Sequence, residues 1–205
     1  MTSTTKCTDK YRPVRRAFLK EAYPSTRTAA LAAPAIRHKQ CMRASRDGFD
    51  IFGGANFSPC RSYRYTLART WQATGPTALF ICLNPSTADE ATDDATVRRC
   101  IGFAKRLGFG RLLLTNLFGF RATCPIALTK ATDPVGPEND DWIREASMAA
   151  DLTIVAWGIH GRLHERDQAV LRNLSTPHCL GTTKDGQPRH PLYLSANASL
   201  KKYRG

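Results

Sequence analysis

A chain of 205 residues with 42% hydrophobic and 23% charged residues has the length and composition of one globular domain, which excludes wholesale disorder. No apolar run approaches the roughly 20 residues that span a bilayer, so we expect no membrane partner. Seven scattered cysteines, an odd number without a CxxC pair, argue against a disulfide framework and a zinc site, and they predict reduced thiols in a cytoplasmic protein.

The net charge of +13 suggests a polyanionic partner, but most of the excess lies near the N-terminus. Residues 1–47 carry 11 Lys/Arg and three Asp/Glu, whereas the remaining residues carry 19 and 14. We predict a basic, flexible leader over 1–47 and a single α/β domain over 48–205. The leader is either a phosphate-binding arm or a solvated tail. Its composition also fits a transit peptide, or an extension upstream of a start at Met42.

The predicted elements of the domain alternate between strands and helices. Alternating apolar and polar residues predict a half-buried strand over 63–67, and the apolar run 77–83 predicts a central strand covered on both faces. Helical spacing over 94–107 ends at Gly108. The next expected elements are a strand at 111–116, a helix at 138–150, a strand at 152–157, a helix at 162–174 and a short strand near 179–180. This order predicts a three-layer α/β sandwich with a mostly parallel, twisted central sheet.

Polar or aromatic residues follow each predicted buried strand. In parallel sheets ligands bind beyond the carboxyl ends of the strands, so these exits together form a candidate site. The exits are 84–87, 116–118, 157–160 and the loop that holds Lys184 and His190.

The residues at these exits have both functional and structural interpretations. Asn84, before a proline, either presents its amide to a ligand or opens a turn capped by Ser86 or Thr87. Asn116 ends a strand of leucines, and a buried asparagine is either a structural bridge or a reader of a hydrogen-bonding edge. His190 is either a donor to a developing anion or a loop histidine without that role.

Four motifs taken together resemble the uracil-DNA glycosylase-like superfamily. They are the strand-end Asn-Pro at 83–86, the strand with asparagine at 112–117, the strand that ends in Trp-Gly at 155–158, and the His-Pro motif with its following loop at 190–195. A closer resemblance, over 84–89, 93–99, 116–123, 133–140 and 181–194, is to a bacterial and phage family known as domain of unknown function 1643.

The glycosylase resemblance implies a hydrolase for DNA repair or base modification, which cleaves the N-glycosidic bond of a damaged or modified base flipped into its pocket. It implies that Asn84 and His190 are catalytic, that Asn116 reads the base and that no cofactor or metal is required. The partner would be nucleic acid, with DNA favoured over RNA. Further substrate-binding candidates are Pro85, Ser86, Thr87, Asp89, Phe118, Arg121, Trp157, Lys184, Leu192 and Tyr193, and the phosphate-binding candidates are Arg98 and Arg99.

Two features depart from the glycosylase pattern and keep alternatives open. Asn84 stands where the most active glycosylases carry an acidic residue, and the segments 93–99 and 133–140 have no role in that scheme. One alternative is a non-catalytic nucleic-acid-binding protein of the same fold. Another is an enzyme on a free nucleotide or nucleoside, with Arg121 and Lys184 among the phosphate ligands. No feature of the sequence sets the oligomeric state.

Overall fold

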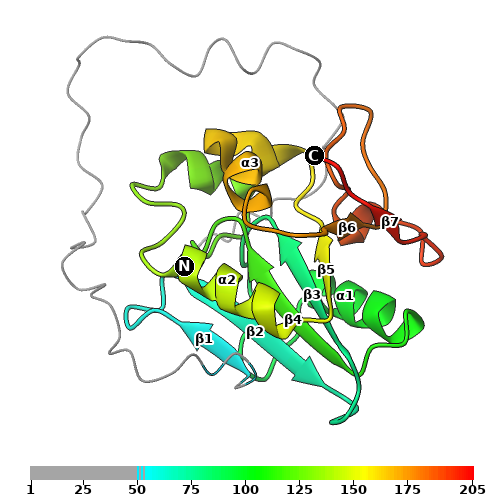
Figure 1. Cartoon of the computed structure of the whole chain (residues 1–205). Coiled ribbons are helices and arrows are strands. Elements are labelled where there is room, and N and C mark those ends of the chain that lie inside the picture. The colour runs from blue at the N-terminus through cyan, green and yellow to red at the C-terminus, as the bar shows by residue number, and fades with distance from the viewer. Residues whose placement is uncertain (1–49, 51, 53) are drawn as a thin grey trace, which may run out of the picture. The chain divides into compact units, whose positions relative to one another are not determined.

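The computed structural model of the protein describes residues 50, 52 and 54–205, all of which belong to one compact unit (Figure 1). The predicted leader, residues 1–47, lies outside the described residues, and the domain boundary at residue 48 stays a prediction. Every helix in this part of the chain falls short of the length and apolar character that a bilayer span requires.

A mixed sheet of seven strands forms the centre of this unit, in the order β1-β2-β4-β3-β5-β6-β7 (Figure 1). The strands are β1 (Ala55–Phe57), β2 (Arg64–Thr70), β3 (Thr77–Cys82), β4 (Arg111–Asn116), β5 (Leu152–Val155), β6 (His178–Cys179) and β7 (Lys201–Lys202). The three pairs that join β4, β3, β5 and β6 are parallel, and the other three are antiparallel. The prediction of a mostly parallel sheet is therefore wrong, because antiparallel strands flank the parallel centre at both edges.

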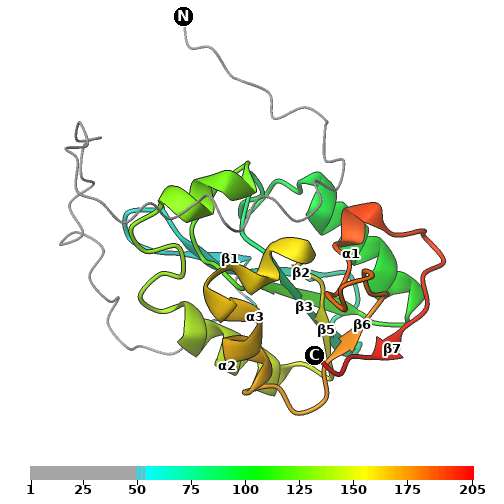
Figure 2. The ribbon, with the colours of Figure 1, turned by 90° about the horizontal axis from the view of Figure 1, so that it is seen from above.

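Helices cover both faces of the sheet. They are α1 (Ala95–Arg106), α2 (Asn139–Ala149) and α3 (Arg166–Leu171), with 3₁₀ turns η2 (Pro125–Lys130), η3 (Ile159–Glu165) and η4 (Pro191–Tyr193). Figure 2 shows α1 on one face and α2 with α3 on the other. Phe80 and Cys82 pack in the core that α1 covers, whereas Leu79 and Ile81 pack beneath α2 and α3. The strand β3 is buried along its whole length, as the apolar run predicts.

The predicted helix at 162–174 is wrong over its first part. The chain there forms the 3₁₀ segment η3 over Ile159–Glu165, and it becomes α-helical only over Arg166–Leu171. His164 and Glu165 adopt φ values of 55° and 52°, a left-handed conformation that interrupts a helix. The other predicted helices and the longer strands correspond to α1, α2 and β2 to β5, whereas the short strands β1 and β7 were not predicted.

Candidate functional site

The carboxyl ends of β4, β3 and β5 lie side by side at one edge of the sheet. Leu117 N donates to Cys82 O at 2.9 Å, and Ala156 N donates to Ile81 O at 2.8 Å, so the strand exits stay hydrogen-bonded. The chain leaves β3 toward α1, but it leaves β4 and β5 toward the helices on the opposite face (Figure 2). Such a divergence is the topological switch point at which open α/β sheets bind ligands.

Asn116 is the last residue of β4 and is 1% exposed. Because side chains alternate along a strand, it follows Leu112 and Leu114 on the face that α1 covers. Neither its Oδ1 nor its Nδ2 has a hydrogen-bond partner among the described residues. A buried donor or acceptor left unpaired costs about 1–3 kcal/mol, and most buried polar groups in native proteins are paired. Both polar atoms of this side chain are therefore left without a partner by the described part of the fold.

A second buried asparagine, Asn139, has a structural role in the same region. It begins α2, is fully buried, and its Nδ2 donates to Asn116 O at 3.0 Å and to Leu117 O at 3.1 Å. These bonds hold the start of α2 against the end of β4. Asn139 is thus a bridge between two backbone segments, whereas the Asn116 side chain bridges nothing.

Asn84 joins the loop after β3 to the loop after β4. Its Nδ2 donates to Pro85 O at 3.0 Å and to Ala122 O at 2.7 Å, and Ala122 N donates to Pro85 O at 2.9 Å. The amide donors of Asn84 are therefore used by the backbone. Its side-chain oxygen is the atom that a ligand or a water molecule could use.

His190 precedes η4 and lies beside the exit of β5, since a Cβ built on Gly158 would be 3.5 Å from the Cβ of His190. Its Nδ1 accepts a hydrogen bond from Leu192 N at 3.4 Å, which assigns the ring proton to Nε2. Burial lowers the pKa of His190 to about 4, and the carboxylate of Asp94 opposes this shift. At neutral pH the ring is therefore an uncharged donor through Nε2.

We expect this histidine to destabilise the fold as the pH falls from about 6.5 to about 4. Over that range the unfolded chain binds a proton at His190 and the folded chain does not, so the free energy of unfolding decreases as the pH falls. We therefore expect urea denaturation to show that the free energy of unfolding falls less between about pH 7 and about pH 4.5 in His190→Gln than in the wild type. The exposed His164, replaced in the same way, is the control. Equal losses in all three proteins would contradict the prediction.

Arg64, which was not among the predicted site residues, brings a buried cation to the same end of the sheet. It is 2% exposed, and its Nη1 donates to Ala88 O at 2.8 Å. Burial lowers its pKa to about 10, Asp94 raises this pKa, and Arg121 lowers it further. Asp94 is thus within electrostatic reach of both Arg64 and His190. The only signal in the sequence was an arginine within a strand otherwise rich in aromatic residues.

Two predicted site residues lie in the core on the opposite face. Phe118 and Trp157 are 0% and 1% exposed and pack beneath α2 and α3. Trp157 Nε1 donates to Gln187 Oε1 at 2.8 Å, and Gln187 Nε2 donates to Asp167 Oδ2 at 2.8 Å. These buried hydrogen bonds anchor the loop that carries His190. In the structure Trp157 therefore packs in the core and helps to hold this loop.

The remaining predicted residues divide between structural contacts and the surface. Asp89 accepts hydrogen bonds from Ala91 N and Thr92 N, which lower its pKa. Arg99 donates to Leu194 O at 2.5 Å and so fixes the end of η4 against α1. Exposed positions are held by Thr87, Arg98, Lys184, Leu192 and Tyr193, and Ser86 is half-buried.

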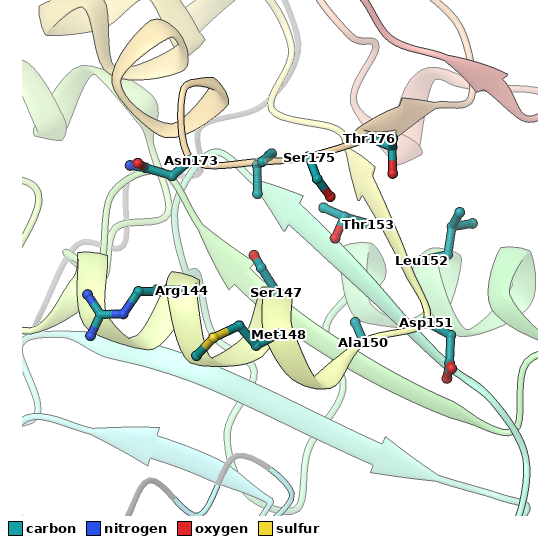
Figure 3. Close-up of a pocket in the computed structure, with 11 residues that line it drawn as sticks. Arg144, Ser147, Met148, Ala150, Asp151, Leu152, Thr153, Asn173, Ser175 and Thr176 are labelled. Atoms are coloured by element: carbon teal, nitrogen blue, oxygen red, sulfur yellow. The ribbon is translucent and has the colours of Figure 1, made fainter.

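Two surface pockets lie away from Asn116. One, of about 300 Å³, is at the amino end of β5, between α2 and residues 173–176, and Figure 3 shows its largely polar lining. Its Asp151 accepts a hydrogen bond from Thr77 N at 2.7 Å. The other, of about 170 Å³, runs between α1 and residues 196–197 and is lined by three arginines. No group of three or more His, Cys, Asp or Glu residues in the described part of the chain could hold a metal ion.

Comparison with known proteins shows that a family model described as "Protein of unknown function (DUF1643)" matches residues 64–192, from the start of β2 into η4. The matched range contains Arg64, Asn84, Asn116 and His190. No curated protein and no solved structure matches the chain.

Proposed function

The chain belongs to the DUF1643 family, and we propose that its site binds a nucleobase of DNA and hydrolyses the N-glycosidic bond of that base, as a uracil-DNA glycosylase-like enzyme. The observation that carries this proposal is the unpartnered amide of Asn116. A carboxamide offers a donor and an acceptor side by side, which is the pattern that pairs with the edge of a nucleobase. Buried at a switch point of the sheet, this amide is suited to read such an edge.

The neighbouring side chains supply the groups that hydrolysis requires. The Asn84 oxygen would hold a water molecule toward the sugar, and orientation of that water supplies part of the rate enhancement. The bond breaks with negative charge developing on the departing base. The neutral Nε2–H of His190 would donate to an oxygen of that base, and such donors are most effective in a desolvated site.

Access to Asn116 requires a loop to move, because the residue is only 1% exposed. Residues 83–94, at this end of the sheet, consist mainly of bends and irregular backbone. Segments of this kind commonly close over bound substrates. We propose that this segment opens to admit the base and then excludes water from the site, whereas the loop over 181–190 stays anchored through Gln187.

The charge of helix α1 is an argument for a polyanionic partner. It carries four basic residues and no acid in twelve positions: Arg98, Arg99, Lys105 and Arg106. Three of these line the groove beside residues 196–197. Lys and Arg side chains that neutralise phosphates dominate binding to DNA. The helix packs against η4, so this basic surface adjoins the turn that follows His190.

A single-turnover assay on oligonucleotides that contain uracil, mismatched or hypermodified bases tests the proposal. We expect base release by the full chain, and a decrease of roughly 10²- to 10³-fold in His190→Leu, because leucine has no donor for the developing anion. Arg144→Gln, a surface change on α2 at the other end of the sheet, should leave the rate unchanged. Binding that depends on Asn116 without release of any base would instead identify a non-catalytic nucleobase-binding protein and refute the hydrolase.

A further inference from the structure

Arg64 and Arg121 are held close together by backbone pairing. Arg64 N donates to Gly119 O at 3.0 Å, and Arg121 N donates to Ser62 O at 3.0 Å, so the start of β2 runs alongside residues 119–121. The two positive charges act on each other, since Arg121 lowers the pKa of Arg64. A pair of like charges in a partly desolvated position is unfavourable unless another charge compensates it.

Both guanidinium groups have an unused donor that is buried. The Nε of Arg64 and the Nε of Arg121 are each buried and have no hydrogen-bond partner in the part of the chain that the structure describes. Arg121 is otherwise oriented by its Nη1, which donates to Arg61 O at 3.2 Å, and by the Phe57 ring, whose centre lies 5.0 Å from its guanidinium carbon. These contacts fix the plane of the group without using its Nε.

No ion pair joins Arg64 or Arg121 to any carboxylate in the described residues. Asp93 pairs with Arg69, and Glu90 pairs with Arg61. Asp94 acts on Arg64 electrostatically, but its carboxylate caps α1 by accepting from Val97 N. This part of the site therefore has two arginine donors that no described carboxylate uses.

We infer that Arg64 and Arg121 form a subsite for a phosphate group at the end of the sheet where Asn116 lies. Arginine is suited to this role because its planar fork donates two parallel hydrogen bonds to the oxygens of a phosphate. The inference rests on the proposed function in one respect: the phosphate would belong to the nucleotide whose base Asn116 reads. Its own basis is the pair of arginines, which is independent of any hydrolysis.

Isothermal titration of the full chain with inorganic phosphate tests the subsite directly. We expect saturable binding at one site per chain, weakened at least about tenfold in Arg121→Gln, because a charge-assisted contact is lost. Arg121 is only half-buried, so this variant should fold even if Arg64→Met does not. Arg144→Gln removes an exposed charge far from the subsite and should bind phosphate as the wild type does. Absence of saturable binding, or equal weakening in Arg144→Gln, would overturn the inference.

The source of the phosphate is identified by comparing a nucleoside, its 5′-monophosphate and a short single-stranded oligonucleotide. A gain of tenfold or more for the monophosphate over the nucleoside indicates a free nucleotide. The same gain for the oligonucleotide alone indicates a backbone phosphodiester. Equal affinity for all three refutes the subsite. If the wild-type chain releases no base, and both it and Asn116→Leu bind phosphate, the hydrolase is refuted while the subsite is supported.

Discussion

Replacing Asn116 by leucine is expected to raise the free energy of unfolding and to abolish nucleobase binding. The substitution removes two buried polar atoms that have no partner among the described residues, and leucine has the same branched shape with methyl groups in place of Oδ1 and Nδ2, so the gain should be about 1–3 kcal/mol. The same change removes the donor and acceptor that would pair with a base. Urea denaturation measures the first effect, and titration with nucleobases or oligonucleotides measures the second. Residues that serve a ligand often lower stability in this way.

Asn139→Leu is the matched control for this experiment. It removes the two hydrogen bonds that Nδ2 donates to Asn116 O and Leu117 O, although Leu117 O keeps its bond from Arg166 Nε. The change also removes Asn139 Oδ1, which has no partner among the described residues, so the free energy of unfolding should fall by about 1–2 kcal/mol. The two asparagines should therefore respond with opposite signs. A loss of stability in Asn116→Leu as large as in Asn139→Leu would show that Asn116 is a structural bridge.

Replacing Gln187 by leucine is expected to give the largest loss of stability among the loop substitutions. Gln187 is 5% exposed and connects Trp157 Nε1 to the carboxylate of Asp167, which is itself 2% exposed. The variant leaves a buried indole N–H and a buried carboxylate without this partner. The expected decrease in the free energy of unfolding is about 2–5 kcal/mol, measured by urea denaturation.

The same substitution tests how the loop that carries His190 is held. Arg189 N donates to Gly181 O at 2.9 Å, and Thr183 N donates to Gln187 O at 2.8 Å, so the loop has its own backbone bonds. Its side-chain anchor to the core is Gln187. Lys184→Leu, an exposed change in the same loop, should alter stability by no more than about 0.5 kcal/mol. A similarly small effect for Gln187→Leu would mean that the buried hydrogen bonds of Gln187 do not hold the loop.

The parallel centre of the sheet could be predicted because its residues are apolar on both faces. The run over 77–83 has one physical solution, a strand covered by helices on both sides, and β3 is that strand. The helix at 94–107 was equally clear from its periodicity, and in the structure Asp94 caps it by accepting a hydrogen bond from Val97 N. The strands β1 and β7, with three and two residues, are too short for a periodic signal.

The meeting of the strand exits at one edge of the sheet was predictable, but the surroundings of each side chain were not. Strand exits at 84 and 116 meet because parallel strands bring their carboxyl ends to one edge. Trp157 lies two residues beyond the end of β5 at Val155 and packs in the core beneath α2 and α3. The run of apolar residues did not indicate where β5 ends, so it could not show on which face Trp157 lies. Arg64 gave little signal, because a strand arginine is usually a solvated residue and only burial distinguishes it.

The sequence by itself determined that Asn116 ends a buried strand beside Asn84, because apolar patterning and chain breakers are local properties. It left open whether Asn116 bridges backbone groups or reads a ligand. The tertiary structure decided which groups surround each amide: Asn139 takes the bridging role, and both atoms of the Asn116 side chain stay unpaired. Pairing of buried polar groups depends on segments distant in the chain, so it follows from packing and cannot be obtained from local pattern.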